Sequence, residues 1–236
     1  MSSASLLRRR LVPLTALAFA ALLVALLVSL GPTRDADAVA SHGMRAGAAG
    51  HTSATTTFSK RGFHDKMRKL WEQHVEWTRM AITDFAAGSG GFDATAARLL
   101  QNQVDIGAAI KPFFGTKAGN QLASLLHDHI AIAVKMLQAA KAGDTTTFND
   151  EKAKWYRNAN QIADFLSAAN PKYWPRDMMR QMMKVHLNQT LVEASDELQG
   201  DFAGSVAKYD KIEHHMLQMA DDLSSGIIAR FPAKFR

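Results

Sequence analysis

The chain has 236 residues, a formal net charge of +6 and no cysteine. The absence of cysteine excludes disulfides, zinc–thiolate sites and thiol chemistry. Lys and Arg do not recur along one helical face, so the positive excess is not the footprint of a nucleic-acid-binding protein.

The first 40 residues have the pattern of a targeting segment. Three arginines, residues 8–10, precede an uncharged run over residues 11–30, which is about the ~20 residues needed to cross a bilayer. Small residues at 36–40 suit signal peptidase. Residues 1–40 are therefore predicted to be either a cleaved signal peptide or a retained membrane anchor. Both alternatives predict an extracytoplasmic protein, secreted or attached to the cell membrane through this segment.

The remainder is predicted to be helical, after a flexible Gly-, Ala-, Ser- and Thr-rich tether at residues 41–62. Apolar residues recur with helical spacing. Long helices are expected at 63–87, 117–142, 146–169, 176–199 and 202–229. A short helix over about 93–103 and an irregular connector lie between the first two. No stretch alternates long enough to form a strand, so one all-α domain is predicted at residues 63–230, followed by a C-terminal tail at 231–236.

An internal repeat of 57 residues supports this architecture. It places His129 on His186, and Gly143-Asp144 on Gly200-Asp201. The repeat predicts two helical hairpins in an antiparallel up-down bundle, with the first long helix flanking them. In that first helix, Trp71-x-x-His74 is similar to Trp155-x-x-Asn158 of the third long helix.

Each long helix carries one polar side chain at a position expected to be in the core. In chain order these are His74, His129, Asn158, His186 and His215. The last four each lie fourteen residues from the Gly-Asp turn of their own hairpin. Because antiparallel helices rise about 1.5 Å per residue, equal spacing predicts equal height. We therefore expect these four in one cross-section, with His74 approaching from the flanking helix.

Two functions fit such a layer. Neutral imidazoles are common metal ligands, and His74, His129, His186 and His215, with Asn158 beside them, could hold zinc or copper, ligate a haem or bind a small ligand. This predicts an extracytoplasmic binding protein. Alternatively, the layer only sets helix register, as a buried Asn does in coiled coils, in a non-catalytic structural or interaction module of the cell envelope.

Two further patterns bear on that choice. Four methionines at 178, 179, 182 and 183 precede His186, and thioethers beside imidazole favour copper(I), although methionine also fills cores. The sequence contains no Gly-x-Ser-x-Gly, His-Glu-x-x-His, phosphate-binding glycine loop or dinucleotide fingerprint. Nothing in the residues therefore argues for an enzyme.

Several motifs resemble an uncharacterised bacterial family of exported helical bundles. They are Leu70-Trp71-x-x-His74-Val75-x-Trp77-Thr78-Arg79, Arg98-Leu99-Leu100-x-Asn102, Lys111-Pro112-Phe113-Phe114-Gly115, Ala139-Ala140-Lys141-Ala142-Gly143-Asp144, Trp155-Tyr156-x-Asn158 and Met219-Ala220-Asp221. The resemblance covers roughly residues 66–231 and implies the same all-α fold. Members often carry the labels glycosyltransferase or acetylglutamate kinase, for which this chain has no supporting motif. His215 stands where the family pattern implies an amide residue.

Overall fold

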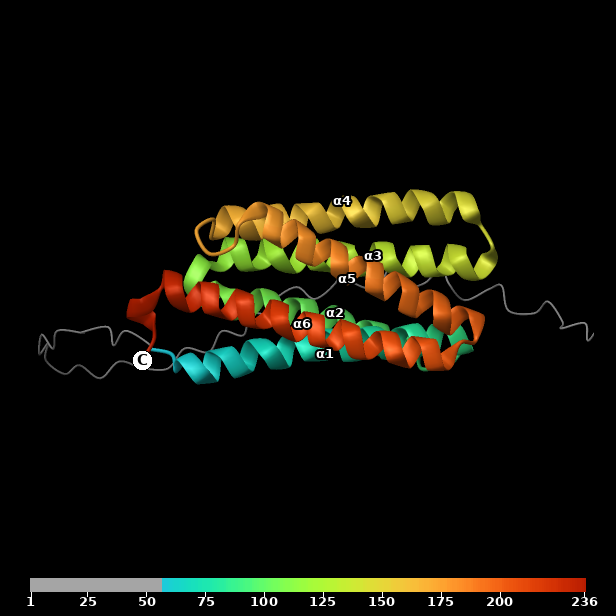
Figure 1. The fold of residues 1–236 in the computed structure, drawn as a ribbon, viewed down its shortest axis with the longest axis horizontal. Coiled ribbons are helices and arrows are strands. Elements are labelled where there is room, and N and C mark those ends of the chain that lie inside the picture. Colours follow the sequence, from blue (N-terminus) through green and yellow to red (C-terminus); the bar gives the residue numbers. More distant parts are fainter. Residues whose placement is uncertain (1–56) are drawn as a thin grey trace, which may run out of the picture. The chain divides into compact units, whose positions relative to one another are not determined.

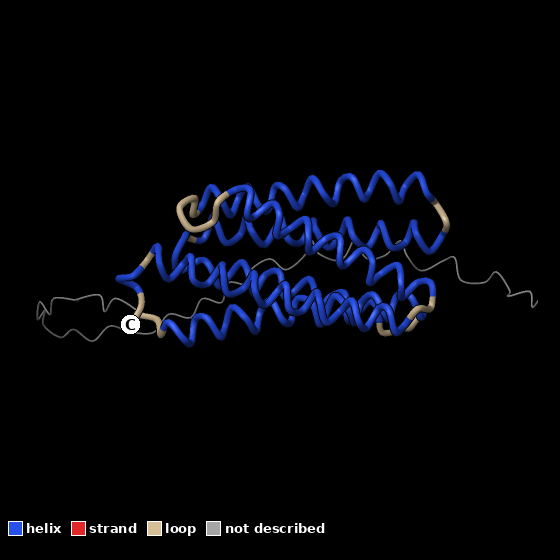
Figure 2. The backbone as a smooth tube through the Cα atoms, viewed as in Figure 1, coloured by secondary structure: helices blue, strands red, loops and turns tan. Residues whose placement is uncertain are grey.

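The computed structural model describes residues 57–236, and that part of the chain is an all-α bundle without a β-strand (Figures 1 and 2). The predicted fold class is thus confirmed. The helices are α1 Lys60–Ala87, α2 Phe92–Phe114, α3 Thr116–Ala142, α4 Thr145–Ala169, α5 Arg176–Gln199 and α6 Phe202–Arg230, followed by the short 3-10 helix η1 Pro232–Lys234. The targeting segment and most of the tether lie outside the described residues.

The six helices form a closed ring of three antiparallel hairpins, α1–α2, α3–α4 and α5–α6. Each helix packs against the next one along the chain, and α6 returns to pack against α1 (Figure 1). Residues 57–236 belong to one compact unit with its own hydrophobic core. None of the helices between residues 57 and 236 is long and apolar enough to cross a bilayer.

Matching caps explain the two Gly-Asp turns of the sequence repeat. Gly143 and Gly200 end α3 and α5 with φ of 71° and 80°, a left-handed conformation that favours glycine. The following Asp144 and Asp201 each accept a hydrogen bond from a backbone N–H in the first turn of the next helix. The short turns therefore bring the helices of each hairpin into antiparallel contact.

The region between the first two long helices differs from the prediction. We expected a short helix ending near residue 103, but α2 is 23 residues long and ends at Phe114. Gly107 lies inside α2 where this helix packs closely on α3, since a Cβ at this position would lie 2.5 Å from the backbone oxygen of Gly119. Pro112 lies in the last turn, so it removes one intrahelical hydrogen bond and the helix ends two residues later. Hence α1 belongs to a third complete hairpin instead of flanking two.

The C-terminal residues pack onto the bundle. Phe235 is buried in the core, and its neighbours form a short parallel bridge with Phe58, in which the N–H of Phe58 donates to the carbonyl of Lys234 at 2.8 Å. Helix α1 begins at Lys60, slightly before the expected start. Both ends of the described chain therefore meet at one end of the bundle (Figure 1).

Candidate functional site

Three histidines converge inside the bundle, as the equal spacing predicted. His74, His129 and His186 come from α1, α3 and α5, and each is at most 4% exposed. The ring centroid of His186 lies 5.9 Å from that of His74 and 6.3 Å from that of His129. His74 was expected to approach from a flanking helix, and it lies within the cluster because α1 and α2 form a complete hairpin.

Asn158 positions the His129 ring. The Nδ1–H of His129 donates to the Asn158 side-chain oxygen at 2.8 Å, while the Asn158 amide donates to the Leu125 carbonyl at 3.0 Å. Trp155 stacks on the other side of the imidazole, with centroids 5.1 Å apart. Since Nδ1 carries the proton, Nε2 of His129 holds a lone pair, and this buried atom has no hydrogen-bond partner. An unpartnered buried acceptor costs about 1–3 kcal/mol.

Two residues of α2, which the sequence analysis did not identify, make the equivalent hydrogen bonds to α1. The Gln103 amide donates to Nδ1 of His74 at 3.2 Å, which leaves the proton of that imidazole on Nε2. Asn102 donates to the Leu70 carbonyl at 3.0 Å. Both amides are completely buried. A signal was present, because Gln103 follows His74 by 29 residues, the same distance that separates Asn158 from His129.

His215 is at the expected height but does not join the central cluster. It is only half-buried, and its Nε2 donates to the Met182 carbonyl at 3.0 Å. The ring thus contacts the backbone of α5 instead of the bundle axis. The predicted four-residue convergence is therefore correct for His129, Asn158 and His186, and His215 departs from it.

The three hairpins share one hydrogen-bonding scheme. In each, a side chain of the second helix donates to the carbonyl four residues before the buried histidine of the first. The three bonds run from Asn102 to Leu70, from Asn158 to Leu125 and from His215 to Met182. His74 is thus equivalent to His129 and His186, and its proposed similarity to Asn158 is wrong.

A cavity of about 50 Å³ adjoins the histidines. Most of its wall is made by equivalent positions of three helices, namely His74, Thr78 and Ile82 in α1, His129, Ala133 and Leu137 in α3, and His186, Thr190 and Ala194 in α5. A water molecule needs about 10–15 Å³ on this measure, so the space suits a few waters or a molecule of a few heavy atoms. A larger hollow of about 220 Å³, lined by residues such as Arg180 and Lys184 over α4 and α5, does not include the histidines.

The interior keeps these imidazoles uncharged. Burial lowers the pKa of His74 to about 3, helped by repulsion from His129. Burial also lowers the pKa of His129 to about 4, although its hydrogen bond to Asn158 acts in the opposite direction. Burial also lowers the pKa of His186 well below its usual value, with further contributions from the neighbouring histidines. The layer therefore resists positive charge near neutral pH.

The arrangement is unfavourable for a metal ion. Among residues 57–236, no three His, Asp or Glu side chains are placed to hold one. Three imidazoles on a tetrahedral zinc would have ring centroids about 5 Å apart, because each Zn–N bond is about 2.0–2.1 Å. The observed centroid distances of 5.9 and 6.3 Å are longer. Met179 and Met183 pack in the hydrophobic core, and neither lines the cavity.

Comparisons with known proteins add no assignment. A scan against protein-family models finds no match to this chain, and searches of curated proteins and of solved structures find none either. The resemblance to exported helical bundles therefore stays a prediction from the quoted motifs.

Proposed function

We propose that this domain is an extracytoplasmic binding protein whose central cavity takes a small uncharged molecule bearing a hydroxyl group. The observation that carries this proposal is the unpartnered Nε2 of His129, a residue that lines a mostly apolar cavity. A hydroxyl could donate to that lone pair and accept from the Nε2–H of His74, which lines the same cavity. The extracytoplasmic location rests on the predicted targeting segment.

The electrostatics favour a neutral ligand over copper or zinc. A site that lowers imidazole pKa values through desolvation also penalises any other cation placed there. No carboxylate lines the cavity to compensate a metal charge. The volume limits the ligand to a few heavy atoms, far below the ~300–1,000 Å³ of common ligand pockets.

A second candidate function has its own support. The shared bond from each second helix to the first would fix the register of three hairpins without any ligand. On this alternative, the domain is a structural or interaction module, and the cavity holds only water. The two candidate functions therefore differ in whether an organic molecule replaces water at Nε2 of His129.

Ethanol and dimethyl ether form a matched pair of probes, because they share one molecular formula and only ethanol donates a hydrogen bond. In protein with ¹⁵N-labelled histidine, ethanol should shift the Nε2 resonance of His129 saturably, and dimethyl ether should shift it much less. Ala133→Leu, which adds side-chain volume to the cavity wall, should abolish the shift, and Ala108→Leu on the exposed face of α2 should retain it.

Three results would contradict the binding proposal. Equal shifts from both probes would remove the role of the hydroxyl. No saturable shift from either probe would favour the structural module. Stoichiometric zinc or copper in protein purified without a histidine tag would replace the neutral ligand with a metal ion.

A further inference from the structure

One end of the bundle is strongly basic. It comprises residues 57–68, 110–120, 170–180 and 228–236, which the antiparallel helices bring together at the left of Figure 1. These segments contain twelve Lys or Arg against two Asp. The sequence distributes them over four separate regions, so the concentration of charge exists only in the folded protein. We call these four segments the basic end.

The opposite end carries the reverse charge. Residues 84–95, 139–152 and 193–210 contain ten Asp or Glu against three Lys or Arg. The domain therefore has its charge separated along its long axis, although residues 57–236 as a whole carry only a small positive excess. Such a field orients the molecule near a charged surface.

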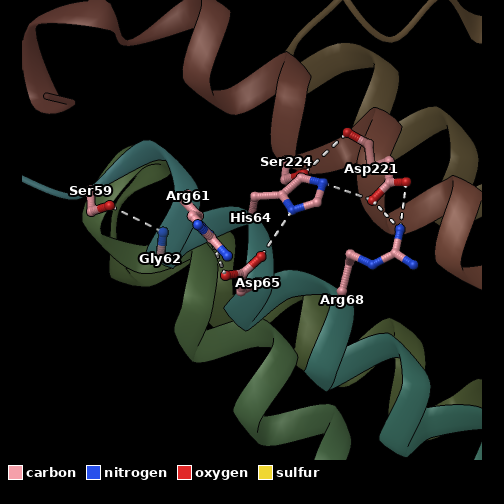
Figure 3. A network of polar contacts seen from close by, with 8 residues as sticks. All are labelled: Ser59, Arg61, Gly62, His64, Asp65, Arg68, Asp221 and Ser224. Carbon is pink, nitrogen blue, oxygen red and sulfur yellow. Dashed lines mark hydrogen bonds and ion pairs between the residues drawn. The ribbon is translucent and has the colours of Figure 1, made fainter.

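Part of the basic end is neutralised by ion pairs. Arg68 donates to Asp221, which also contacts His64 (Figure 3). Arg176 and Arg180 both pair with Asp164. Six exposed side chains of the basic end make no ion pair within residues 57–236: Lys60, Lys66, Lys117, Lys172, Arg230 and Arg236. These six cations are available to an external partner.

Aromatic rings accompany the unpaired cations. The guanidinium of Arg230 lies 5.7 Å from the ring centre of Phe114 and 5.4 Å from that of Phe231, and the ammonium of Lys172 lies 5.1 Å from the Tyr173 ring. All three rings are half-buried. Basic residues beside partly exposed aromatic rings are typical of surfaces that meet the headgroup region of a bilayer.

We propose that the basic end docks on an anionic lipid bilayer. The position of the preceding chain supports this partner over other polyanions, because residue 57 leaves the domain at the basic end and the apolar run 11–30 lies upstream of it. An anchor or a recently inserted segment would hold this end close to the bilayer. The acidic end then faces away, because anionic lipid repels it. This inference is independent of what the central cavity binds.

The attraction is electrostatic and therefore sensitive to charge and salt. Each basic residue near an anionic surface strengthens association about five-fold. Replacing Lys66, Lys117 and Lys172 by Gln should weaken docking about a hundred-fold. A matched control replaces three exposed basic residues outside the basic end, Lys135, Arg157 and Lys211, by Gln. Both variants have the same net charge, so only the position of the charge differs.

The experiment uses the full chain reconstituted in vesicles of phosphatidylcholine alone or with phosphatidylglycerol. Brief acylation followed by mass spectrometry reports the accessibility of Lys60, which both variants retain. On phosphatidylglycerol vesicles, Lys60 should be protected several-fold in the wild type and in the control variant, but not in the Lys66, Lys117 and Lys172 variant. Protection should disappear at about 1 M salt, where the Debye length is about 3 Å.

Other outcomes would overturn the proposal. Equal protection on phosphatidylcholine alone would show that charge is not recognised. Equal loss of protection in both variants would show that net charge, and not the basic end, is responsible. Protection of equal strength from soluble polyphosphate at the same phosphate concentration would make the basic end a general polyanion site.

Discussion

At the scale of single residues, two histidines of the polar layer are each hydrogen-bonded to an amide side chain on the second helix of the same hairpin. His129 depends on Asn158, and His74 depends on Gln103. These bonds satisfy groups that would otherwise be costly to bury. They also determine which nitrogen carries the proton, so the chemistry of the cavity depends on amides as much as on histidines.

Acid should destabilise the fold through the three buried histidines. In the unfolded chain they take up protons below a pKa of about 6.5, whereas the folded pKa values of His74 and His129 are about 3 and 4. Stability should therefore fall as pH falls from about 6.5 to 4, by about 2 kcal/mol at pH 5 for each of His74 and His129. Glu193 acts in the opposite direction, because burial raises its pKa to about 7.

Urea denaturation between pH 7.5 and 4.5 measures this dependence. His129→Gln should remove about one third of the slope, since one of three groups no longer titrates. A midpoint that rises steadily toward pH 4.5 in the wild type would contradict the assignment of neutral buried imidazoles.

The shared side-chain-to-carbonyl bond predicts contrasting effects at two positions. Asn158→Leu should cost about 1–3 kcal/mol, because it leaves the His129 Nδ1–H unpaired and removes the second hydrogen bond to the Leu125 carbonyl. His215→Gln should change stability by less than about 1 kcal/mol, since an amide can also donate to the Met182 carbonyl. Chemical denaturation of both variants checks this, and equal losses would show that an amide does not replace the His215 hydrogen bond.

At the scale of elements, the close approach of α2 and α3 explains why a glycine lies inside α2. A Cβ on Gly107 would lie 2.5 Å from the Gly119 oxygen and 2.8 Å from the Ala123 Cβ. Small residues here allow the backbones to come together, so the glycine that weakens α2 locally strengthens its packing. Helix propensity alone does not predict this trade-off.

Gly107→Ala should therefore destabilise the domain by about 1–3 kcal/mol, through overpacking against α3. Gly90→Ala is the matched control, because nothing lies within 4 Å of its added Cβ. The control should be neutral or slightly stabilising, since alanine lowers the entropy of the unfolded chain. Thermal denaturation followed by circular dichroism compares them, and similar melting temperatures would argue against the tight α2–α3 contact.

At the scale of the whole molecule, the ring of helices is closed by contacts between distant parts of the chain. Helix α6 packs on α1, and the C-terminal residues pair with those just before α1. Phe235 stacks on Phe113 with ring centres 5.3 Å apart and lies 5.4 Å from Phe63. This aromatic cluster joins α1, α2 and the C-terminus at the basic end.

Phe235→Ala should cost about 3–5 kcal/mol, because it removes a buried ring and leaves a cavity between α1 and α2. Phe202→Ala, at a position 63% exposed, should cost less than about 0.5 kcal/mol. Urea midpoints of the two variants make the comparison. A loss below about 1 kcal/mol for Phe235→Ala would show that the C-terminal residues do not contribute to the closed core.

The sequence alone determined the all-α class, the Gly-Asp turns and the common height of His129, Asn158 and His186. These features follow from local rules, because helical periodicity, capping and rise per residue depend on neighbours in the chain. The 29-residue spacing from His74 to Gln103 was also readable, but the short helix expected over about 93–103 was not paired with the first long helix.

Only the tertiary structure decided the third hairpin, the inward or outward direction of each histidine, the cavity and the separation of charge. Each depends on how close two backbones approach or on which distant segments meet at one end. His215 illustrates the limit, since its spacing matches that of Asn158 while its ring reaches the α5 backbone instead of the axis. Spacing along a helix determines height, but packing between helices determines what a side chain contacts.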